Sequence, residues 1–66
     1  MKNNIRVLRA IKNLTQAELA ELIQVSRQTI NTIEAGKYVP STVLALKLAR
    51  VFTVPIEEIF ELEGDE

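Results

Sequence analysis

Hydrophobic residues recur along the chain every three or four positions, which is the spacing of short amphipathic helices. The first series, Ile5, Leu8 and Ile11, is interleaved with basic side chains and predicts a helix over residues 4–12 with these three residues on its apolar face. Helix-starting and helix-stopping residues separate the later series, so the chain divides into five short helical segments. Segments this short cannot each bury an apolar stripe alone, and we expect one small all-α bundle.

Capping residues and helix breakers set the limits of the next three helices. Thr15 followed by Glu18 is the pattern of a capping box and begins the second helix. Ser26 is suited to cap the third helix and Ser41 the fourth. Gly36 ends the third helix as a left-handed stop. The residues that these helices are expected to bury are Leu19, Ala20, Ile23, Ile30, Ile33, Leu44, Ala45, Leu48, Ala49 and Phe52.

The C-terminal residues predict a fifth helix and a short strand. Pro55 suits the first turn of a helix, where Glu57 and Glu58 would complement the positive end of the helix dipole. Residues 60–62 alternate between apolar and acidic side chains, which is typical of a strand. The expected fold is therefore a five-helix, all-α domain over residues 1–66, with a short strand at the C-terminal end as an optional further element.

Composition limits the chemistry of the chain. Its 66 residues include no His and no Cys, which excludes disulfides, cysteine zinc sites and catalysis by a His base or a Cys nucleophile. Glu57 and Glu61 would share a helical face, but no His or Asn joins them, so we expect a solvated acidic surface and no metal site. The sequence predicts neither an enzyme nor a cofactor.

Hydropathy predicts a cytoplasmic location. No apolar run approaches the roughly 20 residues that span a bilayer, and the amino terminus lacks the apolar core of a signal peptide. We therefore expect a soluble protein with no membrane partner.

The net charge of −1 is the sum of two opposite parts of the chain. Residues 1–50 contain all eight basic side chains and three acidic ones, a net charge of +5. Residues 51–66 contain six acidic side chains and no basic one, a net charge of −6. A basic surface on a small domain is the electrostatic footprint of a nucleic-acid-binding protein. We expect the basic part to meet DNA and the acidic end to be repelled by it.

The turn between the second and third helices is the most specific signal. Ile23 ends one helix and Ser26 caps the next, which leaves a three-residue turn that begins at Gln24. A turn this short makes the helices cross steeply, as in a helix-turn-helix, which we place at residues 16–35. The outward face of its second helix carries only hydrogen-bonding side chains, namely Arg27, Gln28, Asn31 and Thr32.

A known family shows the same pattern, carried here by the runs TQAELAELIQVSRQTINTIEAGKYVPS and LALKLARVFTVPIEEIF. Over residues 4–60 the chain resembles the helix-turn-helix family of lambdoid phage repressors and Xre-type regulators, most closely the minimal single-domain members of the cytolysin-operon repressor type. The resemblance implies a lambda-repressor-like fold and a transcriptional regulator that binds double-stranded DNA. Gln24 departs from the pattern, because many members have Gly at this left-handed position, and should cost about 1 kcal/mol of stability.

Side-chain chemistry and the resemblance together predict the DNA contacts. Arg can pair with guanine, and Gln or Asn with adenine, from the first two turns of a recognition helix. The predicted base-contacting residues are Ser26, Arg27, Gln28, Asn31 and Thr32. For Asn31, a contact with a phosphate is the alternative to a base contact. The predicted phosphate-contacting residues are Gln16, at the start of the second helix, and Lys37 and Tyr38 in the loop after the third. For Tyr38, the alternative to a phosphate contact is a structural role in which its ring packs over this loop.

Two further charged residues have a structural interpretation. The resemblance pairs Arg9 with Glu34 in a partly buried salt bridge that ties the first helix to the third. We therefore expect these two side chains to stabilise the fold rather than to contact DNA.

The small number of basic side chains predicts a homodimer, because one copy would bind DNA weakly at physiological salt. A two-fold dimer would read a pseudo-palindrome with half-sites about 34 Å apart. The predicted interface consists of Val54, Ile56, Ile59, Phe60 and Leu62. The favoured function is a repressor that occludes a promoter. The alternative is an antitoxin or interaction module whose C-terminal segment neutralises a partner protein and which autoregulates its operon.

Overall fold

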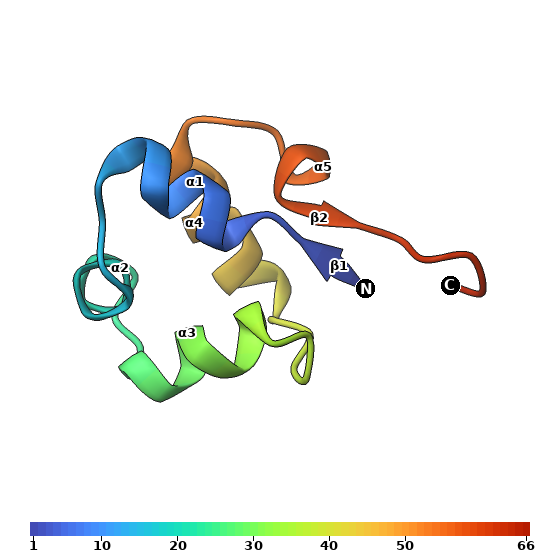
Figure 1. Ribbon diagram of the computed structural model, residues 1–66, viewed down its shortest axis with the longest axis horizontal. Coiled ribbons are helices and arrows are strands. Elements are labelled where there is room, and N and C mark those ends of the chain that lie inside the picture. Colours follow the sequence, from blue (N-terminus) through green and yellow to red (C-terminus); the bar gives the residue numbers. More distant parts are fainter.

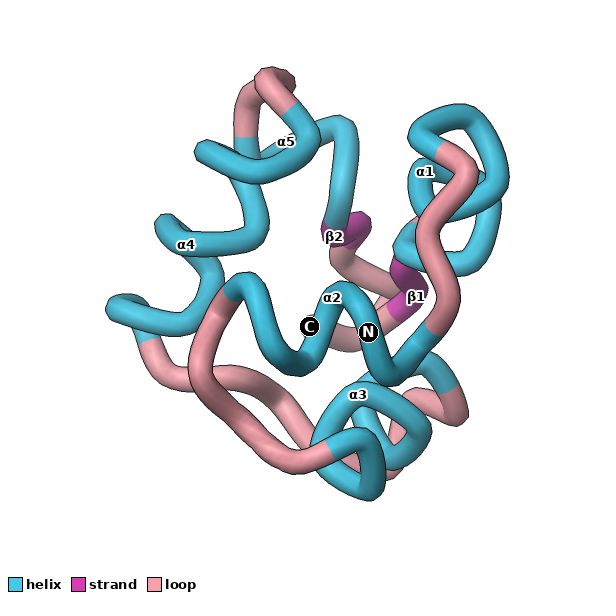
Figure 2. The backbone as a smooth tube through the Cα atoms, turned by 90° about the vertical axis from the view of Figure 1, so that its left-hand side faces the viewer, coloured by secondary structure: helices cyan, strands magenta, loops and turns pink.

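The computed structural model describes all 66 residues as five helices and a two-stranded sheet (Figure 1). The helices are α1 (Ile5–Lys12), α2 (Gln16–Leu22), α3 (Arg27–Glu34), α4 (Thr42–Phe52) and α5 (Ile56–Ile59). The strands are β1 (Lys2–Asn3) and β2 (Phe60–Glu61). In Figures 1 and 2, α3 lies at the lower edge of the molecule and α5 near the upper edge, with the sheet between them. The predicted five-helix fold with a short C-terminal strand is confirmed.

The short sheet joins the two ends of the chain. β1 and β2 pair antiparallel, with Lys2 opposite Glu61 and Asn3 opposite Phe60. Asn4 extends the connection, because its backbone N–H donates to the carbonyl of Ile59 at 2.8 Å. The strand at the C-terminal end was expected, but its partner was not, because two residues are too few to show an alternating pattern.

The predicted caps are present at the starts of three helices. The hydroxyl of Thr15 accepts the N–H of Glu18 at 3.0 Å, and the Glu18 carboxylate accepts the N–H of Thr15 at 2.9 Å, which completes the capping box of α2. Hydrogen bonding of the Glu18 carboxylate to the backbone N–H of Thr15, followed by the Thr15 side chain, holds the pKa of Glu18 below its ordinary value. Ser26 and Ser41 each accept the N–H of the residue three positions later. The limits of α2, α3 and α4 therefore follow from local sequence.

Four helices end in the same left-handed turn. The residues with positive φ are Asn13 (57°), Gln24 (62°), Gly36 (76°) and Thr53 (58°). In each turn, the next residue donates its N–H to the carbonyl five positions earlier, which satisfies a free helix carbonyl. Only Gly36 adopts this conformation without a steric cost, because it has no Cβ. The left-handed conformation expected at Gln24 is thus confirmed.

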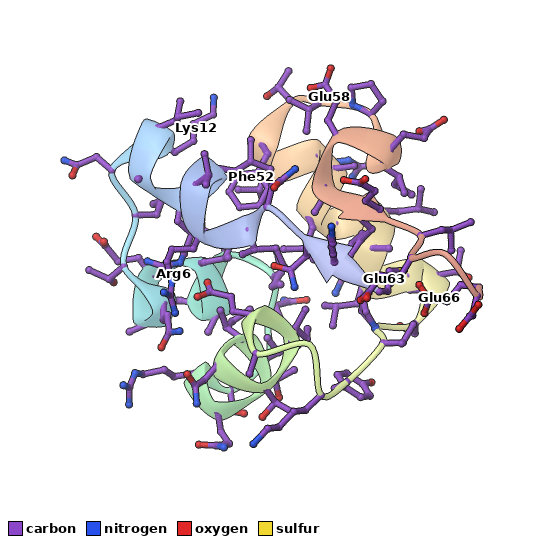
Figure 3. All side chains as sticks on the ribbon, turned by 45° about the vertical axis from the view of Figure 1, so that its right-hand side comes forward. Arg6, Lys12, Phe52, Glu58, Glu63 and Glu66 are labelled. Atoms are coloured by element: carbon purple, nitrogen blue, oxygen red, sulfur yellow. The ribbon has the colours of Figure 1, made fainter.

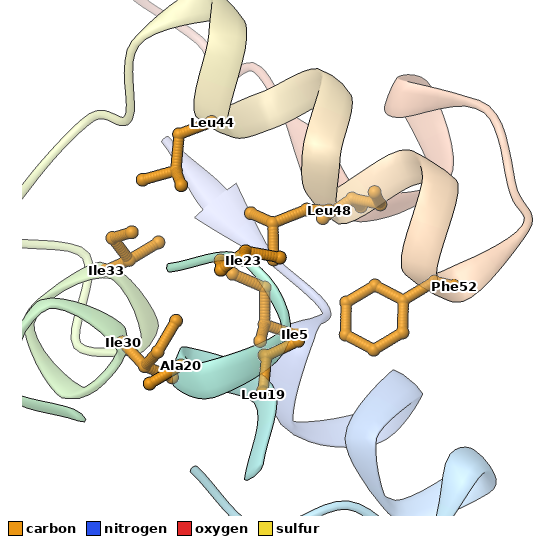
Figure 4. Close-up of a cluster of buried hydrophobic side chains, with 10 residues drawn as sticks. Ile5, Leu19, Ala20, Ile23, Ile30, Ile33, Leu44, Leu48 and Phe52 are labelled. Carbon is orange, nitrogen blue, oxygen red and sulfur yellow. The ribbon is translucent and has the colours of Figure 1, made fainter. Parts of the chain in front are cut away.

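The core is built from all five helices and contains no polar side chain (Figure 4). Its ten buried residues are Ile5, Leu19, Ala20, Ile23, Ile30, Ile33, Leu44, Leu48, Phe52 and Ile59. Ala45 and Ala49, which were expected to be buried, are only half-buried. No helix combines the length and the hydrophobicity needed to cross a membrane.

Three sequence predictions near the ends of helices are wrong. Ile11 is 72% exposed, because a spacing of three residues rotates about 60° per step on a helix with 3.6 residues per turn. Ile59 is fully buried in the core, since it is the inward position of the four-residue α5, and is not available for an interface. Glu61 shares no helical face with Glu57, because the chain becomes extended at Phe60.

The left-handed turn after α2 provides a stability test. Replacing Gln24 with Gly should raise the free energy of unfolding by about 1 kcal/mol, because the Cβ strain is removed. Denaturant unfolding of the two proteins measures this difference. Gln24→Ala is the matched control: it also removes the contact between the Gln24 Oε1 and the Lys47 Nζ at 3.4 Å, but it keeps the Cβ. An equal gain in both variants, or none with Gly, would contradict the strain.

Candidate nucleic-acid interface

Helices α2 and α3 pack directly against each other across a tight turn (Figure 2). The small side chain of Ala20 is buried between them together with Ile30. Val25 is half-buried against the core and donates its N–H to the carbonyl of Ala20 at 3.0 Å, which fixes the turn. This geometry is that of a helix-turn-helix, and it leaves one side of α3 uncovered.

The uncovered side of α3 gathers the residues that were predicted to read bases. Arg27, Gln28 and Asn31 are exposed, and Thr32 is half-buried. The Thr32 hydroxyl donates to the carbonyl of Gln28 at 2.8 Å, so its methyl group is the part left for other contacts. The hydroxyl of Ser26 caps the helix. The structure thus brings four of the five predicted positions to one side of α3, and Ser26 lies at its N-terminal end as the cap.

Glu34, at the C-terminal end of α3, is paired with Arg9 of α1. The Glu34 side chain is 2% exposed and the Arg9 side chain 15%. The Arg9 Nε donates to the Glu34 Oε2 at 2.6 Å, and the Arg9 Nη2 donates to the Glu34 Oε1 at 3.2 Å. The Arg9 Nη1 also donates to the carbonyl of Leu14 at 2.9 Å. The predicted salt bridge is confirmed. Through these bonds Arg9 connects α1 to α3 and to the loop between α1 and α2.

Two more side chains converge on the same carboxylate. The Gln16 Nε2 donates to the Glu34 Oε1 at 3.1 Å, and it also lies 3.4 Å from the Asn31 Oδ1. The Arg6 Nε is 3.7 Å from the Glu34 Oε1, although its side chain is 81% exposed. Sequence reasoning missed Arg6, but its position three residues before Arg9 places it on the same face of α1.

The Glu34 carboxylate remains ionised in this environment. Burial raises its pKa, but the hydrogen bonds from Arg9 and Gln16 and the positive charges of Arg9 and Arg6 outweigh that effect. The net result is a pKa below the ordinary glutamate value. Glu34 is therefore a hydrogen-bond acceptor only, at any pH near neutrality.

The residues predicted to contact phosphates border α3. Lys37 and Tyr38 are exposed in the loop after Gly36, with Tyr38 46% exposed. Gln16 lies at the start of α2, in a shallow groove that also includes Ala17 and Arg27. The side chain of Gln16 is directed into the network around Glu34, so the donors that α2 offers to an anion are backbone N–H groups.

The predicted dimer surface is only partly exposed. Leu62 is 69% exposed, while Val54, Ile56 and Phe60 are half-buried and Ile59 is in the core. Other exposed apolar side chains lie along α4 and before it, namely Val39, Val43 and Leu46.

Charge is distributed unevenly around the molecule. Figure 3 shows Arg6 directed toward α2 and α3, whereas Glu63 and Glu66 lie at the opposite side. The polarity that was expected from the sequence is therefore visible in three dimensions.

Comparison with known proteins identifies the family. The helix-turn-helix family profile matches residues 5–59. The chain belongs to the helix-turn-helix family of the Xre, Cro and CI type. It is 56% identical over 66 residues to an uncharacterised HTH-type transcriptional regulator of Methanocaldococcus jannaschii, and the match covers the whole of both chains.

Two solved structures have the same fold. The restriction-modification controller protein C.AhdI from Aeromonas hydrophila is 36% identical, with a TM-score of 0.76 over 85% of each chain. The SOS-response transcriptional repressor LexA from Eubacterium rectale is 31% identical, with a TM-score of 0.80 over 92% of this chain and 65% of that one. This helix-turn-helix protein is thus a transcriptional regulator of a family that binds double-stranded DNA, and α3 with its neighbours is the candidate interface.

The buried ion pair of this helix-turn-helix protein provides a second stability test. Arg9→Met should lower the free energy of unfolding by about 3 kcal/mol, because the buried Glu34 carboxylate loses its main counter-charge. Replacing Arg9 and Glu34 together with Met should cost less than Arg9→Met alone, because no uncompensated charge remains. Denaturant unfolding at pH 7 measures both losses.

The control for this test is Lys12→Met, which removes an exposed cation from the same helix and should change stability by less than about 0.5 kcal/mol. The pH dependence is a further check. Because the native pKa of Glu34 is lowered, its contribution is present above the ordinary carboxyl pKa of about 4.3 and is lost as the pH falls through the native value. The double variant should therefore lose less stability in acid than the wild type, and an equal acid loss in the two would contradict this role.

Proposed function

We propose that this protein is a dimeric, sequence-specific regulator that inserts α3 into the major groove of a pseudo-palindromic operator. The observation that carries this proposal is the uncovered side of α3, where every side chain can form hydrogen bonds and the helix is held in place by the network around Glu34. An α-helix fits the major groove, where each base pair presents a distinct set of donors and acceptors.

Individual roles follow from side-chain chemistry. Arg27 is suited to the two acceptors of guanine and Gln28 to adenine. Thr32 offers its methyl group to a thymine, since its hydroxyl is bonded to the Gln28 carbonyl. Ser26 lies at the N-terminal end of this surface, and we assign the exposed Lys37 and Tyr38 to the phosphates that flank the groove.

The distribution of charge supports this orientation. Arg6 and Arg27 are exposed, and Figure 3 shows Arg6 at the opposite side of the molecule from Glu63 and Glu66. The acidic Glu61 and Glu63 line a groove with Gly36, just after the C-terminal end of α3. Phosphates would attract the basic side and repel the acidic side. A duplex would therefore meet the side of the molecule that carries Arg6 and Arg27 in preference to the acidic side.

Repression by occlusion is the simplest outcome of such binding. A dimer seated on a promoter excludes other proteins from the same DNA and requires no further contact. The structural neighbour LexA is named as a repressor, which supports the same assignment. The antitoxin alternative assigned the partner protein to the acidic and apolar C-terminal segment. Because Ile59 lies in the core and Phe60 pairs with β1, we propose DNA regulation alone.

We infer that the dimer forms through the exposed and half-buried apolar side chains at the C-terminal end, without the buried Ile59. The remaining residues are Val54, Ile56, Phe60 and Leu62. Two copies joined through these residues could each present a recognition helix to successive major grooves, about 34 Å apart.

The base-reading assignment is tested on DNA selected from a random pool. Arg27→Ala should cost about 1–3 kcal/mol on the selected site and relax the preference at one base pair. Lys37→Ala should weaken binding to all sequences alike and reduce the slope of log K against log salt by about 1. Lys12→Ala is the matched control, because Figure 3 places Lys12 at the end of α1 away from α3. Equal losses for Arg27→Ala and Lys37→Ala on random DNA would show that the reading residues are wrongly assigned.

The dimer is tested by sedimentation and DNA binding. Ile56→Glu should shift a dimer to monomers at micromolar concentration and weaken binding to the full operator, because a charge is placed in an apolar interface. Ile11→Glu, at an exposed apolar position on α1, introduces the same charge outside the interface and should leave the dimer intact. A wild-type protein that sediments as a monomer and binds DNA as tightly as Ile56→Glu would exclude this interface.

A further inference from the structure

A chain of side-chain hydrogen bonds leads from the buried carboxylate to the exposed side of α3. The Gln16 Nε2 donates to the Glu34 Oε1 at 3.1 Å and reaches the Asn31 Oδ1 at 3.4 Å. Gln16 belongs to α2, whereas Glu34 and Asn31 lie on successive turns of α3. One amide group therefore connects a residue that is sealed inside the protein with one that faces outward.

The direction of this chain is fixed by Glu34. An ionised carboxylate has no hydrogen to donate, so the end of the Gln16 amide that faces it must be the NH₂ group. That NH₂ group has a second hydrogen, and the atom that Asn31 turns toward it must be an acceptor, its Oδ1. The Nδ2 end of Asn31, with its two donors, is consequently the end directed away from Gln16.

The same contacts occupy both donors of the Gln16 side chain in the protein alone. Both hydrogens of its NH₂ group are engaged within the protein, and its remaining polar atom, Oε1, is an acceptor that a phosphate oxygen would not bind. In the protein alone, the side chain of Gln16 is therefore occupied by protein partners, and a phosphate contact at Gln16 stays a prediction. Its side chain has another use.

We propose that Gln16 is a positioning residue that transmits the fixed polarity of the Glu34 carboxylate to Asn31, and so determines which end of the Asn31 amide is presented to a base. This inference rests on the proposed function, because it requires that α3 enters the major groove. It deepens that function by assigning specificity to two side chains, Gln16 and Glu34, which themselves make no contact with a base.

The physical gain is a smaller loss of freedom on binding. A free Asn amide can rotate and present a donor or an acceptor to the same base edge, so it discriminates poorly between base pairs. When the Asn31 Oδ1 accepts a hydrogen bond from Gln16, the donor end of Asn31 is the one available to a base acceptor in the groove. Preorganisation of this kind improves both affinity and selectivity at the position that Asn31 reads.

The test begins with the base pair that Asn31 reads, which is the position where Asn31→Ala changes the sequences selected from a random duplex pool. Gln16→Met keeps the length of the side chain but removes the amide. It should reduce discrimination at that base pair by about tenfold, and leave the preferences at the other base pairs within about twofold. Combined with Asn31→Ala, it should have no additional effect, because the two residues act as one unit.

Two further variants make this experiment specific. Gln16→Lys retains a group that only donates, so it should keep the Asn31 orientation and the base preference even though its added charge changes the overall affinity. Gln28→Ala is the control partner in the double-variant cycle, since Gln28 lies outside the chain of hydrogen bonds, and its effect should add to that of Gln16→Met. The free energy of unfolding of Gln16→Met is measured as a control. A value close to that of the wild type shows that the fold, with its ion pair between Arg9 and Glu34, is intact.

Each contrary result has a distinct meaning. If Gln16→Met weakens binding to all sequences by one factor and keeps every base preference, Gln16 is a phosphate ligand and the inference fails, while sequence-specific binding stands. If Asn31→Ala alters no base preference, the inference fails because Asn31 reads no base. If the wild-type protein selects no sequence at all, the proposed function itself is overturned.

Discussion

The structure depends on the buried carboxylate of Glu34. This anion lies at the C-terminal end of α3, where the helix dipole is also negative, and its side chain is almost sealed from water. Both conditions disfavour a negative charge. They are offset by two hydrogen bonds from Arg9, one from Gln16 and the nearby charge of Arg6, which come from α1 and α2. The position of α3 is therefore fixed only when the two preceding helices are also in place.

The apolar core and this polar network contribute different properties. Burial of apolar side chains such as Ile30 and Ile33 favours association of the helices but has no preferred direction. The bonds to Glu34 have defined lengths and angles, so they select one rotation of α3 about its axis. For a recognition helix, a fixed rotation about its axis matters more than additional stability, because an error in this rotation would misplace every base-contacting side chain.

The parts of the fold that were predictable from the sequence are the parts with local causes. Caps at Thr15, Ser26 and Ser41 and the steep turn at Gln24 are each encoded within about four residues, and the structure has them all. The partner of β2 and the burial of Ile59 were missed because two and four residues are too few to show a period. Among the site residues, the resemblance paired Arg9 with Glu34, but the link through Gln16 to Asn31 arises only from the crossing of two helices.

The use of a carboxylate so close to a DNA-binding surface carries an electrostatic difficulty, because phosphates repel it. The structure resolves this difficulty by geometry. Arg9 and Arg6 both contact the one carboxylate, which leaves this corner of the molecule with a net positive charge, and the exposed Arg6 lies on the solvent side of the buried anion. What reaches the exposed side of α3 is a neutral amide, Asn31, with an orientation but no charge. The anion can thus orient the reading surface while its own field is compensated before it meets the duplex.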